Sequence, residues 1–374
     1  MTNPTFDALR YVRGWARNTS PPPFRGVFTQ DIEIRSGGDE AVQARRYRPA
    51  SRSPRALPGW VMLHGATRPG PDHAAIVRFA AALASAGGDV LVPDVRAWRS
   101  LDLDPAPARR ALALAARHHC ADPGVRPGGV VLVGLSFGCP QAILAAAELA
   151  AEGLVRGVLG YGGYHSLENT VRFALTGQFE WLERIEYLRP DPYGRWVIAA
   201  NYLHHIPGYE DAEDVSRALG RLAALAGDHG FMAWEPSSDP YKAEVIKSVS
   251  APNGELFRFF APDAAQDPDP RRAEEFAPLL VEAARATHPE LELPQAPDGR
   301  SLPPIRLIHG RQDHLIPFTE TLALERYLRK RADVDATVTD LLAHSRGSGA
   351  SVARLREAMR FFGAIRGAMA LHRR

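Results

Sequence analysis

The feature that most constrains this chain is a serine in a five-residue turn, GLSFG at 134–138. The residues before it, GVVLV at 129–133, are typical of a buried parallel strand, and residues 141–150 have strong helix propensity. In a strand–turn–helix of this kind the serine has a strained backbone and an exposed hydroxyl at the end of a sheet. The glycines are needed where strand and helix pass too close for larger side chains. The context predicts that Ser136 is a nucleophile rather than an incidental turn residue.

Strands and helices are expected to alternate along most of the chain. Strands are predicted at 26–35, 41–48, 59–63, 89–93, 130–133, 154–159, 305–309 and 334–342. Helices are predicted at 74–86, 106–118, 141–150, 319–331 and 351–372. Strands that alternate with helices predict a parallel sheet covered on both faces, so the fold class is α/β.

This alternation stops between about residue 165 and residue 300, where no clear strand is seen and helical patterns at 193–205 and 211–225 dominate. Of the 31 aromatic residues, 15 lie between Tyr164 and Phe260, so this region packs on itself or lines an apolar cavity. Proline- and aspartate-rich stretches at 261–270 and 293–304 predict loop and linker. The expected division is therefore 1–164 and 301–374 for the two parts of an α/β core, and 165–300 for an inserted, mainly helical region.

Composition excludes several function classes. The formal net charge of +2 gives no strong field for nucleic acid or an anionic membrane. No window is apolar enough to span a bilayer, and the first residues do not resemble a secretory signal. Cys120 and Cys139 are expected to be reduced and packed, which fits a cytoplasmic location, and no spacing indicates a metal site.

A short helix is expected near the N-terminus, ended by the three prolines at 21–23. One apolar face of this helix is predicted to dock on the body of the protein. That face is formed by Phe6, Leu9, Tyr11, Val12 and Trp15.

A serine nucleophile needs a histidine to accept its proton and a carboxylate to orient that histidine. In a parallel sheet these partners lie in loops just beyond the strand ends. The strand at 305–309 leads into a loop that carries Asp313, the predicted acid. The last strand leads into a loop that carries His344, the predicted base.

Other residues compete for these two roles. Asp335 and Asp340 lie before or within the last strand rather than past a strand end, so they rank below Asp313. His314 adjoins Asp313, but adjacent residues point in different directions. Packing or surface roles are expected for His204, His205 and His309.

An oxyanion hole requires two N–H donors aimed at the oxygen that gains charge. The backbone amide of Phe137 is one expected donor, because it follows the nucleophile at a helix N-terminus. Ala66, in the loop after the strand at 59–63, is the second, with Gly65 as the alternative. His64 is expected to hold that loop in place rather than to react. The other interpretation of the loop is a plain turn that leads into the next helix and donates no N–H to the site.

Four motifs together resemble the α/β-hydrolase superfamily: Leu63-His64-Gly65, Gly134-x-Ser136-x-Gly138, Gly310-x-x-Asp313 and Ala343-His344-Ser345. Residues 61–94 look especially like its serine esterases and dienelactone-hydrolase-like members. The resemblance covers 59–164 and 303–372. It implies a mostly parallel sheet of about eight strands flanked by helices, with a helical cap inserted after the sixth strand. It also implies a Ser-Asp-His triad and no cofactor, whereas the large insert matches no known lid.

The expected activity is that of a serine hydrolase that cleaves a carboxylic ester of a small or medium apolar acyl compound through an acyl-enzyme on Ser136. An acyltransferase or a peptidase would use the same triad, and a catalytically silent binding protein is the alternative from another class. The insert is expected to be a lid over Ser136, or else a self-packed layer or homodimer contact. If the insert is a lid, aromatic residues such as Phe173, Trp181, Trp196 and Tyr202 would form an acyl pocket, but none of them is assigned to the substrate.

Overall fold

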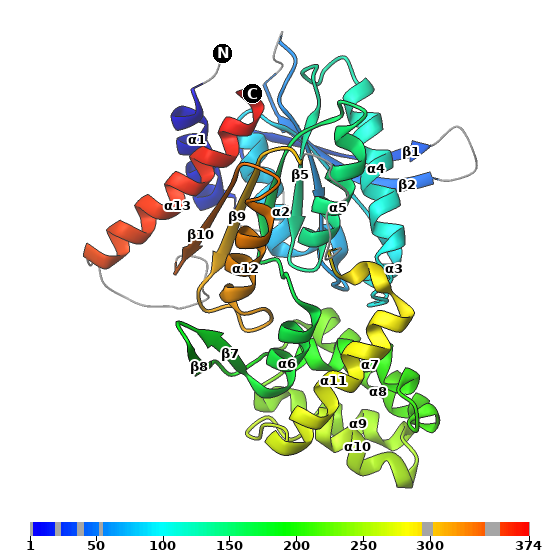
Figure 1. The fold of residues 1–374 in the computed structure, drawn as a ribbon. Coiled ribbons are helices and arrows are strands. Elements are labelled where there is room, and N and C mark those ends of the chain that lie inside the picture. The colour runs from blue at the N-terminus through cyan, green and yellow to red at the C-terminus, as the bar shows by residue number, and fades with distance from the viewer. Residues whose placement is uncertain are drawn as a thin grey trace.

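The computed structural model describes residues 3–18, 24–35, 41–51, 55–293, 302–340 and 352–373. Within these residues the central element is an eight-stranded sheet of order β1-β2-β4-β3-β5-β6-β9-β10 (Figure 1). Its strands are β1 (Val27–Arg35), β2 (Ala41–Pro49), β3 (Gly59–Leu63), β4 (Asp89–Pro93), β5 (Val130–Leu135), β6 (Val155–Tyr161), β9 (Ile305–Gly310) and β10 (Val334–Thr339). Only β2 runs antiparallel to its neighbours, so the sheet is mostly parallel.

Helices cover both faces of this sheet, and every residue of β5 is buried between them. One face is covered by α4 (Ala106–Ala121), α5 (Gly138–Ala150) and α12 (Phe318–Leu328). The other face is covered by α1 (Pro4–Arg17), α2 (Ala74–Ser85) and α13 (Val352–Ala370). Successive side chains of β5 point to opposite faces of the sheet. Leu132 packs on the face covered by α4, α5 and α12, and Val133 packs on the face covered by α1, α2 and α13. The predicted fold class is confirmed.

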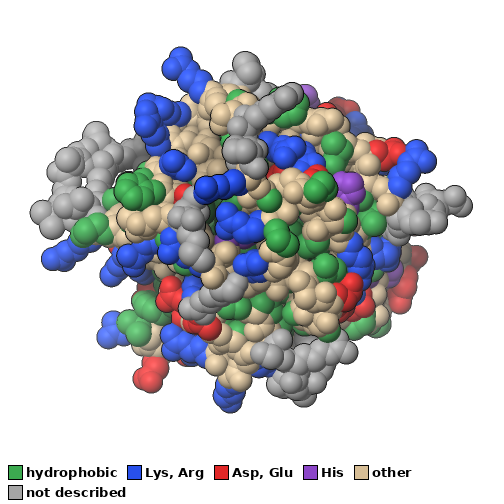
Figure 2. All heavy atoms as spheres, turned by 90° about the horizontal axis from the view of Figure 1, so that it is seen from above, with side chains coloured by type: hydrophobic (Ala, Val, Ile, Leu, Met, Phe, Trp, Pro, Cys, Tyr) green, Lys and Arg blue, Asp and Glu red, His purple; other side chains and the backbone are tan. Residues whose placement is uncertain are grey.

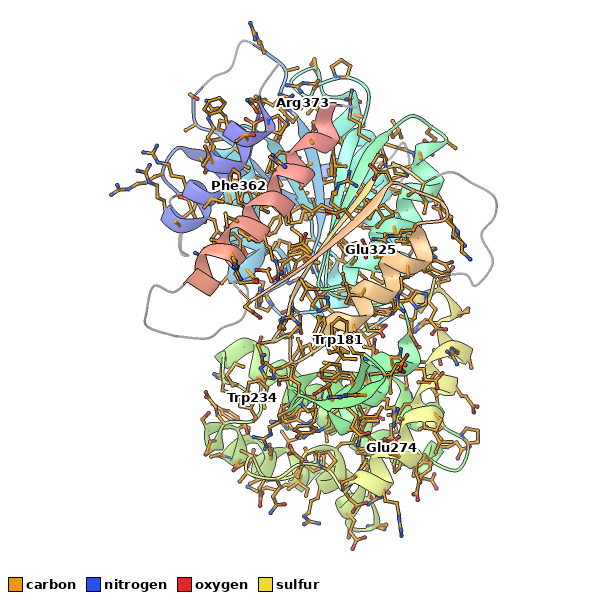
Figure 3. The ribbon with its side chains drawn as sticks, turned by 60° about the vertical axis from the view of Figure 1, so that its left-hand side comes forward. Trp181, Trp234, Glu274, Glu325, Phe362 and Arg373 are labelled. Carbon is orange, nitrogen blue, oxygen red and sulfur yellow. The ribbon has the colours of Figure 1, made fainter. Side chains whose placement is uncertain are left out.

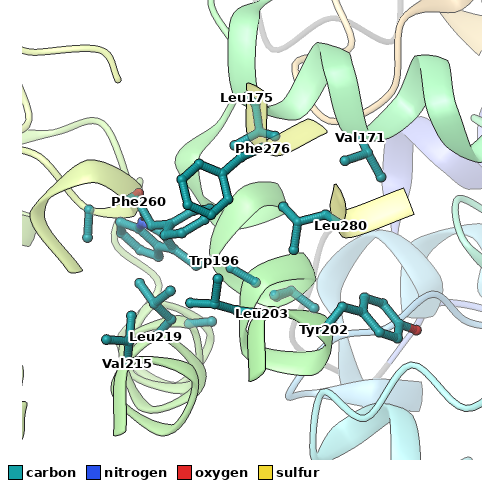
Figure 4. Close-up of a cluster of buried hydrophobic side chains, with 14 of the residues drawn as sticks. Val171, Leu175, Trp196, Tyr202, Leu203, Val215, Leu219, Phe260, Phe276 and Leu280 are labelled. Atoms are coloured by element: carbon teal, nitrogen blue, oxygen red, sulfur yellow. Dashed lines mark hydrogen bonds between the residues drawn. The ribbon is translucent and has the colours of Figure 1, made fainter. Parts of the chain in front are cut away.

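A helical segment, residues 167–291, lies between β6 and β9 in chain order. It contains α6 (Leu167–Thr176), the hairpin β7 (Gln178–Trp181) and β8 (Arg184–Tyr187), α7 (Pro192–Tyr202), α8 (Glu213–His229), α9 (Asp239–Val245), α10 (Gly254–Phe260) and α11 (Pro270–Thr287). Its helices surround their own cluster of buried apolar side chains, with Trp196, Phe260 and Phe276 among them (Figure 4). In Figure 1 this segment lies beyond the carboxyl ends of the parallel strands.

One expectation for the helical segment was wrong, and one of its helices was not predicted. The β7–β8 hairpin is absent from the prediction because its strands have four residues each and its turn residues, Leu182 and Glu183, adopt φ values of 51° and 61° without a glycine or asparagine. Helix α11 begins at Pro270, directly after the proline-rich loop, and the prolines masked its start.

The docked face of α1 also differs from the prediction. Phe6 and Leu9 are 62% and 52% exposed, whereas Tyr11 is fully buried. The helix approaches α2 closely at Gly14, where an added Cβ would lie 2.6 Å from the Cβ of Ser85. Contact through small residues therefore rotates the docked face away from Phe6 and Leu9.

No helix in the described ranges has the length and apolar character needed to cross a bilayer. Both cysteines are free thiols. Burial raises the pKa of the Cys139 thiol to about 12, so it is a packed, unreactive side chain.

Candidate active site

Ser136 occupies the turn between β5 and α5 in a left-handed backbone conformation, with φ at 51°. A non-glycine residue in this region carries strain of about 1–3 kcal/mol, which the surrounding structure must hold. Two backbone hydrogen bonds do so here. The Ser136 N–H donates to the carbonyl oxygen of Tyr161 at 2.6 Å, and the Ser136 carbonyl accepts from the N–H of Cys139 at 2.9 Å.

The glycines on either side of Ser136 have a steric role. A Cβ on Gly134 would lie 2.5 Å from the Gly138 carbonyl oxygen and 2.6 Å from the Cα of Cys139. A Cβ on Gly138 would lie 2.9 Å from the carbonyl oxygen of His64. Both Cβ atoms would collide with backbone atoms, which cannot shift without a large cost in free energy.

Three features together decide the fold. They are the strand order, the single antiparallel strand β2, and the strained serine turn that follows the central strand β5. This chain has an α/β-hydrolase fold. In that fold the loops after the parallel strands supply the reacting groups, and here those loops face the helical segment.

Asp313 lies in the loop after β9, at the same edge of the sheet as Ser136. Its Oδ1 accepts hydrogen bonds from the N–H groups of Leu315 at 2.8 Å and Ile316 at 3.1 Å. Its Oδ2 points toward the end of β6, because a Cβ on Gly162 would lie 3.4 Å away. Since Ser136 bonds to Tyr161, the residue before Gly162, the serine and the carboxylate flank one strand end.

The ionised form of Asp313 is stabilised by His309. Burial alone would raise the pKa of the Asp313 carboxyl, but the hydrogen bond and charge of His309, with the two loop amides, outweigh it and lower the pKa. The Nε2 atom of His309 lies 3.5 Å from Asp313 Oδ2 and 3.0 Å from the Ile316 carbonyl oxygen. Both neighbours are acceptors, so Nε2 carries a proton. The sequence interpretation of His309 as a packing residue missed this contact.

His344 lies outside the described residues, so its position relative to Ser136 is a prediction. The described chain reaches Asp340 directly after β10, and Arg311 of the acid loop donates from its N–H to the Thr339 carbonyl at 3.0 Å. The end of β10 therefore adjoins the acid loop. Of the competing carboxylates, Asp335 is exposed on β10, and Asp340 is exposed and pairs with Arg311 at 3.4 Å.

Two other histidines of the sequence analysis have structural contacts. His64 is fully buried: its Nδ1 lies 2.7 Å from the Gly65 carbonyl and its Nε2 accepts the N–H of Val95 at 3.2 Å. Burial lowers the pKa of the His64 imidazole, so it braces the loop in its neutral form. His314 points into the helical segment, where its Nδ1 bonds to the Arg189 carbonyl at 2.7 Å.

The predicted oxyanion donors lie beside Ser136. Gly65, Ala66 and Phe137 line the same cavity as the serine, and a Cβ on Gly65 would lie 3.9 Å from Ser136 Oγ. Within the described ranges, neither the Phe137 nor the Ala66 N–H has a backbone acceptor. Both residues thus border the cavity with amides that have no backbone acceptor in the described chain.

The cavity has a volume of about 490 Å³ and lies between the loops after the strands and the helical segment. Apolar side chains of both parts line it, including Leu103, Val171, Val197, Ile198 and Leu291. An apolar wall of this kind suits a hydrocarbon group rather than a charged one.

Of the four aromatics predicted for an acyl pocket, only Tyr202 lines this cavity. Phe173 and Trp196 are fully buried within the helical segment, and Trp181 packs against Phe318 of α12, with ring centroids 5.0 Å apart (Figure 3). No single aromatic was assigned to the substrate from the sequence, and these three side chains have packing roles, as aromatics at helical spacing often do.

Comparisons with solved structures return proteins of similar architecture. A brefeldin A esterase, described as a bacterial homologue of human hormone-sensitive lipase, is 18% identical with a TM-score of 0.49, covering 98% of this chain and 83% of its own. A fungal esterase from Rhizomucor miehei is 14% identical with a TM-score of 0.46, covering 97% and 89%. Lipase A of Candida antarctica is 14% identical with a TM-score of 0.46, covering 95% and 79%. At such identities and scores these likenesses say nothing of activity, and the fold assignment rests on the strand order.

No protein-family model matches the chain, and no curated protein matches its sequence.

Proposed function

We propose that this protein is a serine hydrolase that cleaves a carboxylic ester of a small or medium apolar acyl compound. The observation that carries the proposal is the strained Ser136, which opens into an apolar cavity beside two amides without backbone acceptors. Backbone strain at a polar residue in a cavity wall is typical of a reacting group. A serine with only a structural role would be destabilised by this strain without any compensating function.

In the proposed reaction, Ser136 Oγ attacks the ester carbonyl while His344 accepts its proton. The amides of Phe137 and Ala66 donate to the oxyanion of the tetrahedral intermediate. His344 then gives its proton to the leaving alcohol, which leaves an acyl group on Ser136. Water activated by His344 releases the acid, and the ionised Asp313 holds the imidazole in the required tautomer throughout.

The helical segment is proposed to act as the cap of this site, with the division at 165–300 expected from the sequence. Support comes from the cavity walls, since Val171 of α6, Val197 of α7 and Ala226 of α8 face the same space as Ser136. The acid loop also binds the segment directly: the Asp191 N–H donates to the His314 carbonyl at 2.7 Å.

Ester hydrolysis by Ser136→Ala tests the proposal. With p-nitrophenyl butyrate, kcat of the variant is expected to fall by several powers of ten, because the nucleophile is lost while the fold is kept. Ser166→Ala, which removes the N-cap serine of α6 outside the cavity, is the matched control and should keep its activity. Equal rates for Ser136→Ala and wild type would reject the proposal.

Labelling by a fluorophosphonate separates an enzyme from a silent binding protein with the same fold. An activated Ser136 forms a covalent adduct, whereas a silent site stays unlabelled. His344→Asn should abolish labelling, while His314→Asn, beside the acid, should retain it. If His314→Asn lost labelling and His344→Asn did not, the base would be misassigned.

A further inference from the structure

A second, larger cavity lies at the opposite end of the sheet, where the parallel strands begin. Its volume is about 860 Å³, and Pro58, Gly88 and Arg156 place it at the starts of β3, β4 and β6. Its titratable lining consists of Asp7, Arg10, Arg55, Arg126, Arg156, His372 and Arg373. Figure 2 views the molecule from the side where both termini lie, and Lys and Arg side chains gather about the centre of that face.

The positive charge of this cavity is local. The whole chain carries a formal net charge of only +2, yet five arginines line this one space against a single aspartate, Asp7, which pairs with Arg10 at 3.9 Å. Arg156 also donates to the carbonyl oxygens of Pro127 and His372, but neither acceptor carries a charge that would offset the guanidinium. Like charges held within a concave surface repel one another, and low-dielectric walls concentrate their field. A bound anion would relieve that repulsion, so the arrangement favours a negatively charged occupant.

Two polar groups in the cavity wall lack partners in the described chain. The guanidinium of Arg126 has no carboxylate or carbonyl partner there, although it is only partly exposed. The side chain of His372 is 6% exposed, and its Nε2 atom makes no hydrogen bond. Burial, with the nearby charges of Arg126 and Arg156, lowers the pKa of the His372 imidazole to about 3. The imidazole of His372 is therefore neutral in the cavity wall.

The remaining wall is apolar and includes an aromatic ring. Trp60 of β3 lines the cavity and contacts the His372 ring edge-on, with centroids 4.6 Å apart. Leu57, Pro58 and Met369 also line it. The cavity therefore combines an excess of positive charge, which attracts an anionic group, with an apolar surface for the rest of a molecule.

We propose that this cavity binds a small molecule carrying two or more phosphate groups. Arginine is the side chain best suited to phosphate, because its planar guanidinium donates two parallel hydrogen bonds to two oxygens. Several such groups around one space fit a polyanion better than a single carboxylate. The site is independent of the proposed ester hydrolysis, since the length of the parallel strands separates it from Ser136.

Titration calorimetry with sodium tripolyphosphate tests the proposal on the full chain. Wild type is expected to bind one equivalent saturably at an ionic strength matched with sodium chloride, and more weakly as the salt is raised. Arg126→Gln should weaken binding about tenfold or more, because a charge-assisted contact is lost. Its melting temperature in chloride alone should equal that of wild type, which shows that the fold is kept.

The matched control is a pair of arginines on α1. Arg10 lines the cavity, whereas the exposed Arg13, one turn further along the helix, does not. Arg10→Gln should weaken tripolyphosphate binding and Arg13→Gln should leave it unchanged. Absence of saturable binding, or equal losses in Arg10→Gln and Arg13→Gln, would overturn the proposal, because the effect would then be general charge attraction.

Discussion

At the scale of single residues, the candidate site depends on backbone positions that tolerate few side chains. Ser136 is held at a positive φ by its bonds to Tyr161 and Cys139, and Gly134 permits the close crossing of β5 and α5. The geometry at Ser136 is therefore set by neighbours that take no part in the chemistry.

Gly134→Ala is expected to destabilise the protein by roughly 1–3 kcal/mol and to lower activity, because its Cβ would collide with the backbone of Gly138 and Cys139. Thermal unfolding followed by circular dichroism measures the first effect, and p-nitrophenyl butyrate hydrolysis the second. Gly220→Ala in α8 is the control, since its Cβ would make an ordinary 3.5 Å contact with Ala200 and should raise helix stability. Similar melting temperatures for the two variants would contradict the steric argument.

The lowered pKa of Asp313 predicts a pH-dependent contribution to stability. An aspartate in the unfolded chain titrates near about 3.9, and the folded pKa lies below that value. Its contribution is therefore present above about pH 5 and is lost as the pH falls through the folded pKa. The difference in urea midpoint between wild type and Asp313→Asn should be constant from pH 7 to 5 and shrink below about pH 4. A difference that grows with acid would contradict the assigned direction.

At the scale of elements, helix α1 could be predicted from its own sequence, but the face by which it docks could not. Its apolar residues predicted a helix that packs on the body, but Gly14 contacts Ser85 and places Tyr11 inward, against Phe79 at a ring distance of 5.6 Å. Which face docks is set by the partner surface of α2, and the partner is not visible in the residues of α1.

Tyr11 and Leu9 form a matched pair on α1. Tyr11→Ala should cost about 3–5 kcal/mol, because a fully buried ring is removed, whereas Leu9→Ala should change stability by less than about 0.5 kcal/mol. Tyr11→Phe should be neutral or stabilising, since the buried hydroxyl has no hydrogen-bond partner in the described chain. Chemical denaturation measures all three variants. A larger loss for Leu9→Ala than for Tyr11→Ala would mean that the helix docks by its other face.

The bounds of β1 to β6 and of β9 were predictable to within two residues, and the buried strands among them are short apolar runs bounded by glycine or proline. The predicted end of the last strand, residue 342, lies outside the described residues. The loop after β9 was placed correctly, since Asp313 follows the strand end directly. The β7–β8 hairpin was not predicted, because β7 is only partly buried, every residue of β8 is exposed, and the turn uses Leu182 and Glu183. The contact between His309 and Asp313 was also missed, because the chain must fold back after the end of β9 before the two side chains meet.

At the scale of the whole molecule, the described residues form three apolar clusters. Two lie on the faces of the sheet, and the third lies inside the helical segment. Ala66 and Phe137 pack against both the third cluster and the first sheet face, so the candidate site lies at that junction. Substrate preference should then depend on side chains of the helical segment rather than on the triad.

Ala174→Leu tests this dependence, because Ala174 of α6 is buried in the cavity wall. Filling the cavity should lower kcat/KM for p-nitrophenyl hexanoate relative to acetate by about tenfold. Glu168→Leu adds a similar side chain to the exposed side of the same helix and should leave the ratio unchanged. An unchanged ratio in Ala174→Leu would place the acyl group elsewhere.

The most direct measurement of the central claim is mass spectrometry of the protein quenched within the first turnovers of p-nitrophenyl butyrate. A butyryl adduct is expected on the peptide that contains Ser136, in wild type but not in Ser136→Ala. A butyryl group on a different side chain, or undiminished turnover by Ser136→Ala, would contradict it.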